Sequence, residues 1–216
     1  MDPTRAPTDA ELAYARLKQD IVSGHLPPGH KLKIAALRSA YDIGAAPLRE
    51  ALARLIGERV VEQHSNRGFH VRQVSAQDVR DLGQVRILLE CEALRASLAR
   101  ADDSWETALV SAYHGLRLAE DRGAEAAEIE PRNRAFHDAL VAACGSPWLL
   151  DLRDQVYAQH ERYRNLSRGS SSGRNTPAEH AAIYEAALAR DVTATCTQTT
   201  RHIDLTTQAA IQALTR

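Results

Sequence analysis

The stretch that decides the fold is residues 41–55, which read YDIGAAPLREALARL. Residues 42–44 predict a tight connection into a helix that carries Pro47 in its first turn, where the missing N–H group does no harm. Apolar residues then recur every three or four positions and give the helix one apolar stripe. The stripe consists of Leu48, Ala51, Leu52 and Leu55. A short helix over residues 34–41 precedes the turn, so the pair matches a helix-turn-helix.

The segments on either side complete a small unit. A helical pattern covers residues 10–23 and stops at a turn rich in glycine and proline. Residues 60–63 and 68–71 read as two short strands around a polar turn, which predicts a β-hairpin. We therefore expect residues 10–74 to form a winged helix-turn-helix with this hairpin as its wing. Residues 1–9 are expected to be a flexible N-terminus.

From residue 75 onward, helical periodicity replaces the strand pattern. A sequence that resembles a capping box, Ser-Ala-Gln-Asp at residues 75–78, opens the first helix. Six helices fit this part of the chain, at residues 77–100, 104–121, 125–144, 147–167, 177–190 and 192–214. The loop at residues 167–176 has the most flexible composition. The predicted fold class is mainly α: the winged helix-turn-helix, then an all-α antiparallel bundle of six or seven helices over residues 75–216.

The composition is that of an ordinary globular protein with room for two domains. Hydrophobic residues make up 44% of the chain and charged residues 25%. Cys91, Cys144 and Cys196 are odd in number and far apart, which predicts neither a disulfide framework nor a cysteine-rich metal site. The N-terminus is polar, and no stretch approaches the roughly 18 apolar residues that span a bilayer. We therefore expect a cytoplasmic protein with no membrane partner.

The net charge of −1 conceals a difference between the two halves of the chain. Residues 10–75 carry ten Lys and Arg against six Asp and Glu, whereas residues 76–216 carry sixteen against twenty. A positive patch confined to one small domain is what contact with DNA phosphates requires. The pattern favours a nucleic-acid partner for the first domain and leaves the acidic remainder for another task.

Together these motifs resemble the GntR family of transcription regulators. Residues 29–37, residues 41–55 with their Pro-Leu-Arg-Glu-Ala-Leu core, and Arg67-Gly68 carry the resemblance in the first domain. The helical half resembles the FCD sensor domain of the FadR-type subfamily. The resemblance implies a regulator, not an enzyme, that represses a metabolic operon. It also implies a homodimer that binds a palindromic operator in double-stranded DNA.

The resemblance further implies which residues contact DNA. In the family, residues that open the recognition helix enter the major groove, while arginines and the wing meet the backbone and the minor groove. Carried over by position, the contacts are Lys33, Arg38, Ala45, Ala46, Arg49, Arg67 and Gly68. Many relatives have Ser-Arg-Thr at residues 44–46, so an arginine able to contact guanine is missing here. Base readout is therefore expected to depend more on alanine methyl groups, Arg49 and the wing. An isolated Arg49 would instead be interpreted as a solvated side chain that pairs with a carboxylate.

Three histidines on three predicted helices, His137, His180 and His202, each lie beside an apolar stripe. Imidazoles from three helices can bind a divalent ion, although a single buried histidine is more often a core residue. The resemblance implies a metal site, because these histidines match the ligands of metal-binding FCD domains, with Asn133 where an Asp is usual. Zinc is the expected ion, with nickel and manganese as alternatives. Because an amide brings no charge, the ion would favour an anionic effector.

Three arginines are the predicted partners of that effector, because guanidinium groups bind carboxylates with two parallel hydrogen bonds. Arg86 matches an arginine that often faces the FCD cavity, and its alternative is an exposed side chain beside Glu90 at i+4. Arg162 and Arg164 cannot both face inward. The chain resembles in particular the carbon-starvation regulators that respond to glutarate, which implies a small carboxylate effector, such as a short dicarboxylate.

Two other hypotheses remain open for the helical half. A metal-dependent enzyme that acts on a small carboxylate is the alternative function, because three histidines and an open coordination position are what catalytic zinc uses. Against it, the chain has no general base of the H-E-x-x-H type, and Asp138 and Glu179 are expected to point away from the histidines. In the third hypothesis the domain only dimerises and the histidines fill its core.

Overall fold

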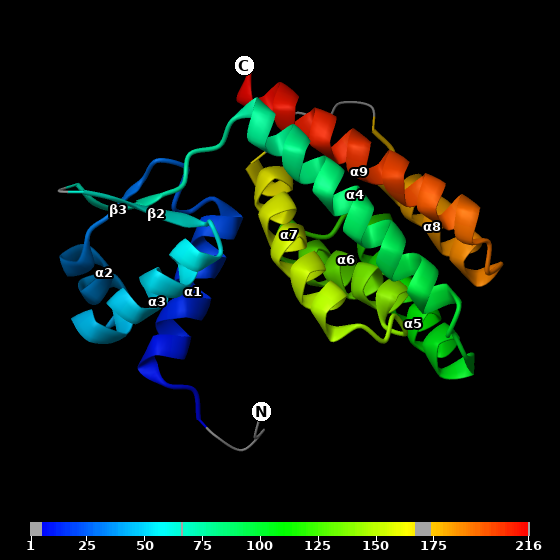
Figure 1. Ribbon diagram of the computed structural model, residues 1–216. Coiled ribbons are helices and arrows are strands. Elements are labelled where there is room, and N and C mark those ends of the chain that lie inside the picture. The colour runs from blue at the N-terminus through cyan, green and yellow to red at the C-terminus, as the bar shows by residue number, and fades with distance from the viewer. Residues whose placement is uncertain (1–5, 66, 167–173, 216) are drawn as a thin grey trace.

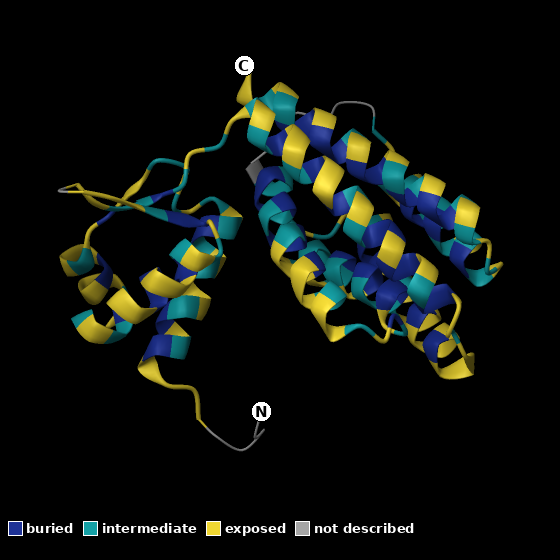
Figure 2. Ribbon diagram, in the orientation of Figure 1, coloured by how far each residue is buried: buried dark blue, intermediate teal, exposed yellow. Residues whose placement is uncertain are grey.

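The computed structural model describes residues 6–65, 67–166 and 174–215, which form two units (Figure 1). The first unit contains α1 (Asp9–Ser23), β1 (Lys31–Leu32), α2 (Ile34–Tyr41), α3 (Ala45–Gly57), β2 (Val61–His64) and β3 (Gly68–Val71). The second contains α4 (Ala76–Leu98), α5 (Asp103–Asp121), α6 (Ala126–Val141), α7 (Pro147–Leu166), α8 (Thr176–Leu188) and α9 (Val192–Leu214). In each unit the buried faces of the helices turn inward (Figure 2). The predicted fold class is confirmed.

The helix-turn-helix forms where the sequence signals predict it. Gly44 is the N-cap of α3, and Pro47 lies in its first turn. The predicted apolar stripe of α3 is fully buried, at 0% exposure for each of Leu48, Ala51, Leu52 and Leu55. These residues pack against α1, which begins at a capping box between Thr8 and Glu11 and ends at Gly24, where φ is 87°.

The wing contains one strand more than predicted. The sheet is antiparallel with the order β1-β3-β2, so β3 is paired on both edges. Gly29, with φ at 78°, turns the chain into β1, and the backbone N–H of Gly29 donates to Val71 O at 2.9 Å. A strand of two residues is too short to show a periodic pattern in the sequence. It forms only through its pairing with a distant segment.

Within its described residues the second unit has six helices, as predicted, with small differences at their ends. The helix expected over residues 125–144 ends at Val141, and residues 142–144 continue as a turn before Gly145, where φ is 73°. Asn175 is the N-cap of α8, and its side chain accepts from Ala178 N. Residues 1–5 of the expected flexible N-terminus and residues 167–173 of the expected loop lie outside the described residues. None of the described helices is long and apolar enough to cross a membrane.

Gly83 lets α4 and α9 approach closely. A Cβ atom at this position would lie 2.6 Å from Thr207 Oγ1 and 3.2 Å from Thr207 Cγ2. The Thr207 hydroxyl cannot move away freely, because it donates to Ile203 O at 2.9 Å and contacts His160 Nε2 at 3.0 Å. The absence of a side chain at residue 83 therefore sets the distance between these two helices.

We expect Gly83→Ala to lower the free energy of unfolding by about 1–3 kcal/mol, the usual cost of overpacking a core. Urea denaturation followed by circular dichroism measures the change. Gly57→Ala is the matched control, because nothing lies within 4 Å of a Cβ at the end of α3. That variant should be neutral or slightly stabilised, since alanine has the higher helix propensity. Equal losses in both variants would contradict the steric explanation.

Candidate metal centre and nucleic-acid interface

The residues predicted to contact DNA lie on the surface of the first unit. Ala46, Arg49, Lys33 and Arg38 are exposed around the start of α3 and along α2, and Ala45 is half-buried. Arg67 and Gly68 are exposed at the wing, where φ of Gly68 is 82°. A hollow along α2 and the turn into α3 is lined by Arg38, Ser39 and Gly44 among others.

The four cations of this surface are Lys33, Arg38, Arg49 and Arg67. Among the described residues, none of them forms an ion pair or a side-chain hydrogen bond. The carboxylate pairing considered for Arg49 is therefore not formed within the described part of the chain. By contrast, Arg54 of the same helix is engaged, with its guanidinium 4.0 Å from the centroid of the Tyr14 ring. All four cations that the resemblance assigns to DNA are therefore free of competing side-chain partners within the described part of the chain.

The structure brings the three predicted histidines together inside the bundle. His137 of α6, His180 of α8 and His202 of α9 are each 1–2% exposed. Their ring centroids are 4.9–5.6 Å apart. One nitrogen from each ring lies within 4.8 Å of the other two. Three helices far apart in sequence thus present imidazoles to one point.

Two carboxylates orient two of these rings. Glu120 of α5 accepts from His180 Nδ1 at 2.9 Å, and Glu179 accepts from His202 Nδ1 at 2.8 Å. A carboxylate at Nδ1 fixes the proton there and leaves the lone pair on Nε2, which is the arrangement around histidines that bind metals. The Nε2 atoms of His137 and His180 are buried and have no hydrogen-bond partner among the described residues.

Burial keeps His137 and His202 neutral. It lowers the pKa of His202 to about 3, and it lowers the pKa of His137 well below its ordinary value, with the neighbouring imidazoles acting in the same direction. Burial acts to raise the pKa of Glu179, but hydrogen bonds from Arg174 and His202 hold it down to about 2. Imidazole nitrogens without a hydrogen-bond partner, with a carboxylate behind two of the three rings, are the donor set that a divalent cation requires. The residues therefore fit a metal ion.

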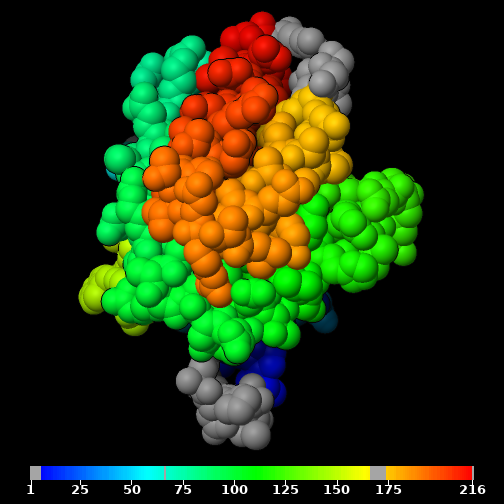
Figure 3. All heavy atoms as spheres, turned by 90° about the vertical axis from the view of Figure 1, so that its right-hand side faces the viewer, coloured from blue at the N-terminus to red at the C-terminus, as the bar shows by residue number. Residues whose placement is uncertain are grey.

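The positions of Glu120 and Glu179 were not predicted, and the expectation for Glu179 is wrong. Glu179 was expected to point away from the histidines, yet it contacts His202. Because α8 packs side by side with α9, a residue next to His180 still faces the neighbouring helix (Figure 3). Asp138 does point away, toward ion pairs with Arg134 and Arg153.

Asn133 lies on α6, one turn before His137, and is 5% exposed. It lines the same cavity as His180 and His202, and this cavity has a volume of about 320 Å³. Asn133 Nδ2 donates to Tyr157 Oη at 3.0 Å. This bond holds the nitrogen end of the amide and leaves the oxygen end as an acceptor. Its role as a metal ligand stays a prediction.

The three candidate effector arginines occupy different places. Arg164 lines the cavity and forms an ion pair with Glu130. Arg86 does not line the cavity; it is 1% exposed and contacts Glu90 at 3.4 Å and His160 at 2.7 Å. Its Nη2 atom is buried with no hydrogen-bond partner among the described residues. The alternative interpretation of Arg86 was an exposed side chain beside Glu90. The pair with Glu90 exists, but the side chain is not exposed.

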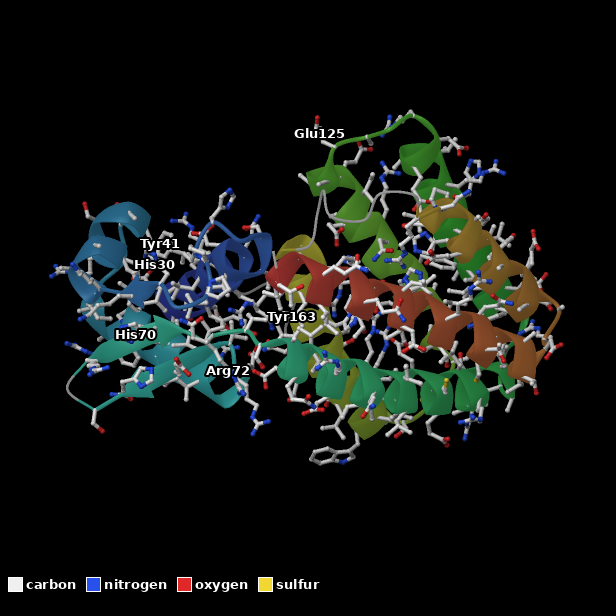
Figure 4. The ribbon with its side chains drawn as sticks, turned by 90° about the horizontal axis from the view of Figure 1, so that it is seen from above. His30, Tyr41, His70, Arg72, Glu125 and Tyr163 are labelled. Atoms are coloured by element: carbon white, nitrogen blue, oxygen red, sulfur yellow. The ribbon has the colours of Figure 1, made fainter. Side chains whose placement is uncertain are left out.

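Arg162 lies away from the cavity, which corrects its assignment as an effector contact. Two residues along a helix correspond to a rotation of about 200°, so Arg162 and Arg164 face opposite sides of α7. Arg162 Nη2 donates to the backbone carbonyl of Arg72 at 2.6 Å, across to the first unit. Arg72 and Tyr163 lie where the two units meet (Figure 4).

Two family models match the chain. The model described as "Bacterial regulatory proteins, gntR family" matches residues 9–71, and the model described as "FCD domain" matches residues 81–205. An uncharacterized HTH-type transcriptional regulator, BphR of Paraburkholderia xenovorans, is 41% identical over 90% of this chain and 82% of its own length. The HTH-type transcriptional repressor GlaR of Escherichia coli is 36% identical over 70% of each chain.

Solved structures share the fold. The chain superposes on E. coli McbR/YncC with a TM-score of 0.77 at 19% identity, over 92% of this chain and 95% of that one. A putative transcriptional regulator GntR from Rhodococcus sp. RHA1 gives a TM-score of 0.76 at 22% identity, over 95% and 97%. At these identities the likeness concerns the architecture alone.

Proposed function

Because the chain belongs to the GntR family of DNA-binding transcription regulators and carries an FCD domain, we propose that a small carboxylate controls its binding to an operator. In this proposal, residues 10–74 bind DNA and residues 75–216 sense the effector. Two copies form a homodimer that represses a metabolic operon in the cytoplasm from a palindromic site. The E. coli relative described as a repressor supports the sign of the regulation.

One observation carries the sensory part of the proposal: the buried, unpartnered nitrogens of the histidine cluster. His137, His180 and His202 would hold a divalent ion, zinc first, with Asn133 as a further ligand. An ion bound there supplies a positive centre to which a carboxylate oxygen can bind. The hypothesis that these histidines are only core residues gives no reason for nitrogens left without partners at the same point.

The cavity is lined by two arginines as well as by Glu120 and Glu130, and the arginines are the residues that could bind an anion. Arg164 and Arg174 line it, and each is held by a glutamate in the structure. A cavity of about 320 Å³ is at the small end of the range for ligand sites, roughly 300–1,000 Å³. A short dicarboxylate such as glutarate fits these limits, with one carboxylate toward the histidines and the other toward an arginine.

Helix α7 supplies a route from the cavity to the DNA-binding unit. One side carries Arg164 at the cavity, and other faces of the helix donate three side-chain hydrogen bonds to backbone carbonyls of the first unit. These bonds run from Gln159 to Glu58 at 2.7 Å, from Arg162 to Arg72 at 2.6 Å, and from Asn165 to Val22 at 2.9 Å. An effector that moves α7 would therefore shift the placement of the helix-turn-helix.

The direct test is the binding of DNA from the promoter region of the protein's own operon. Fluorescence anisotropy would measure the Kd of the zinc-loaded and the chelator-stripped protein, each with and without glutarate. We expect glutarate to change the Kd of the zinc-loaded protein only. An identical response of the stripped protein would contradict control through a metal centre. Binding that does not depend on DNA sequence would contradict the proposal that the protein recognises a specific operator.

Arg49→Ala should weaken binding to that operator by about 1–3 kcal/mol, the usual contribution of one good base contact. Arg49 is exposed on α3 and has no ion pair among the described residues, so the change removes no contact that supports the fold. Arg117→Ala is the matched control, since it removes the same charge from an exposed position on α5. Equal losses on operator and scrambled DNA would show that Arg49 contacts only the backbone.

A further inference from the structure

One glutamate in the histidine cluster serves two partners. Glu179 accepts from His202 Nδ1 at 2.8 Å, and it also accepts from Arg174 Nε at 2.8 Å and from Arg174 Nη2 at 2.5 Å. The same Nη2 atom donates to the backbone carbonyl of His202 at 3.1 Å. Arg174, Glu179 and His202 are therefore held as one hydrogen-bonded group.

The other orienting carboxylate has a different environment. Glu120 accepts from His180 Nδ1 at 2.9 Å, and no cation in the described part of the chain forms an ion pair with it. The side chain of Glu120 is 7% exposed, and those of Arg174 and Glu179 are 14% and 13% exposed. At such burial the charge of Arg174 is only weakly screened by solvent. The two carboxylates thus differ in charge environment although they make the same contact with a histidine.

The charge of Arg174 opposes a cation at the histidines. A carboxylate behind a metal-binding imidazole raises the basicity of the ring, and an arginine on that carboxylate reduces this effect. Arg174 also adds its own repulsion toward a dication nearby. It lines both the inner cavity and an outer groove between α8 and α9, so an anion that enters from the groove meets its guanidinium.

We propose that Arg174 is a positioning residue that neutralises the charge of Glu179. The histidine cluster thereby binds a divalent cation more weakly than it would without the charge of Arg174. An anion that draws Arg174 away from Glu179 would strengthen cation binding, and by linkage the cation would strengthen anion binding to the same extent. The inference rests on the proposed function, because it takes the histidine cluster as the cation site.

The test uses the full chain without an affinity tag and Zn²⁺ alone as the probe. A fluorescent chelator in competition gives the Kd for zinc. Arg174→Gln keeps a hydrogen-bond donor and removes the charge, and we expect it to bind zinc roughly tenfold more tightly, the effect of one poorly screened charge. Glu179→Gln should bind zinc about 10–100-fold more weakly. Arg201→Gln is the matched control, because Arg201 is exposed, lines the outer groove and does not line the cavity.

Weaker or unchanged zinc binding by Arg174→Gln would overturn the inference, because a merely structural arginine cannot tighten a site when it is removed. The same tightening in Arg201→Gln would overturn it as well, since the effect would then be one of overall charge. Arg174→Lys keeps the charge but loses the paired hydrogen bonds to Glu179, so it should gain less zinc affinity than Arg174→Gln does. An equal gain in both variants would also count against the inference. Failure of the unmodified chain to bind zinc would instead overturn the proposed metal centre itself.

Discussion

Glu90→Gln should lower the free energy of unfolding by about 3–5 kcal/mol, the usual cost of breaking a buried ion pair from one side. Glu90 is 2% exposed and accepts from two arginines, Arg86 Nε at 3.4 Å and Arg153 Nε at 3.1 Å. These two arginines are each 1% exposed. Without the carboxylate charge, the helix pair α4 and α7 would have to hold two guanidinium groups inside the bundle.

Most of the decrease in the free energy of unfolding should arise from Arg86. Arg153 keeps other partners, because it also pairs with Asp138 and with Asp154, both of which reach solvent. Burial lowers the pKa of Arg86, and Glu90 is the strongest influence in the opposite direction. No second carboxylate forms an ion pair with Arg86 among the described residues. Its charge would therefore be left without compensation in a medium of low polarity.

Urea denaturation of the metal-free protein measures this effect without contributions from bound ligand. Glu92→Gln is the matched control on the same helix, where an exposed glutamate pairs with Arg95 at 3.5 Å. Glu92→Gln should lower the free energy of unfolding by less than about 1 kcal/mol, as is usual for surface pairs. If Glu90→Gln cost no more than Glu92→Gln, the buried cluster would not be a source of stability.

The first unit could be predicted almost completely because its signals are local. The tight turn, the proline in the first turn and the apolar stripe of α3 all lie within residues 41–55, and each acts through its neighbours in sequence. The strand β1 could not be predicted, because its two residues are ordered only by the distant β3. Local chemistry determined the helix-turn-helix, and long-range pairing completed the wing.

The candidate site could be predicted only in part for the same reason. The positions of His137, His180 and His202 followed from a resemblance, whereas the carboxylates behind them depend on how each helix is rotated in the bundle. Glu179 faces α9 only because α8 lies against it. Arg162 could not be separated from Arg164 either, since only the docking of α7 on the first unit decides which one faces the cavity.

His137→Ala should weaken zinc binding by more than about a hundredfold, because even residues that only orient a ligand contribute 10–100-fold to metal affinity. The Nε2 atom of His137 has no hydrogen-bond partner among the described residues, and burial keeps the ring neutral by lowering its pKa. The ring is therefore a lone-pair donor already in place at neutral pH. Its removal takes away one of three such donors.

The loss of zinc binding in His137→Ala should also reduce the thermal stabilisation that zinc gives. A ligand that binds only the folded state stabilises it by about 2.7 kcal/mol when present at a hundred times its Kd. Zinc should therefore raise the Tm of the unmodified chain and leave that of His137→Ala nearly unchanged. Differential scanning calorimetry of untagged, chelator-treated protein, with and without zinc, measures both values.

Two other histidines make this prediction specific to the cluster. His114 is exposed on α5, so His114→Ala is the control and should keep the zinc-dependent rise in Tm. His160 is buried like the cluster, but both of its ring nitrogens are engaged, by Arg86 at 2.7 Å and by Thr207 at 3.0 Å. Burial alone therefore does not leave an imidazole nitrogen free, and the free nitrogens of the cluster require another partner. An unmodified chain with the same Tm in zinc and in chelator would show that this partner is not a metal ion.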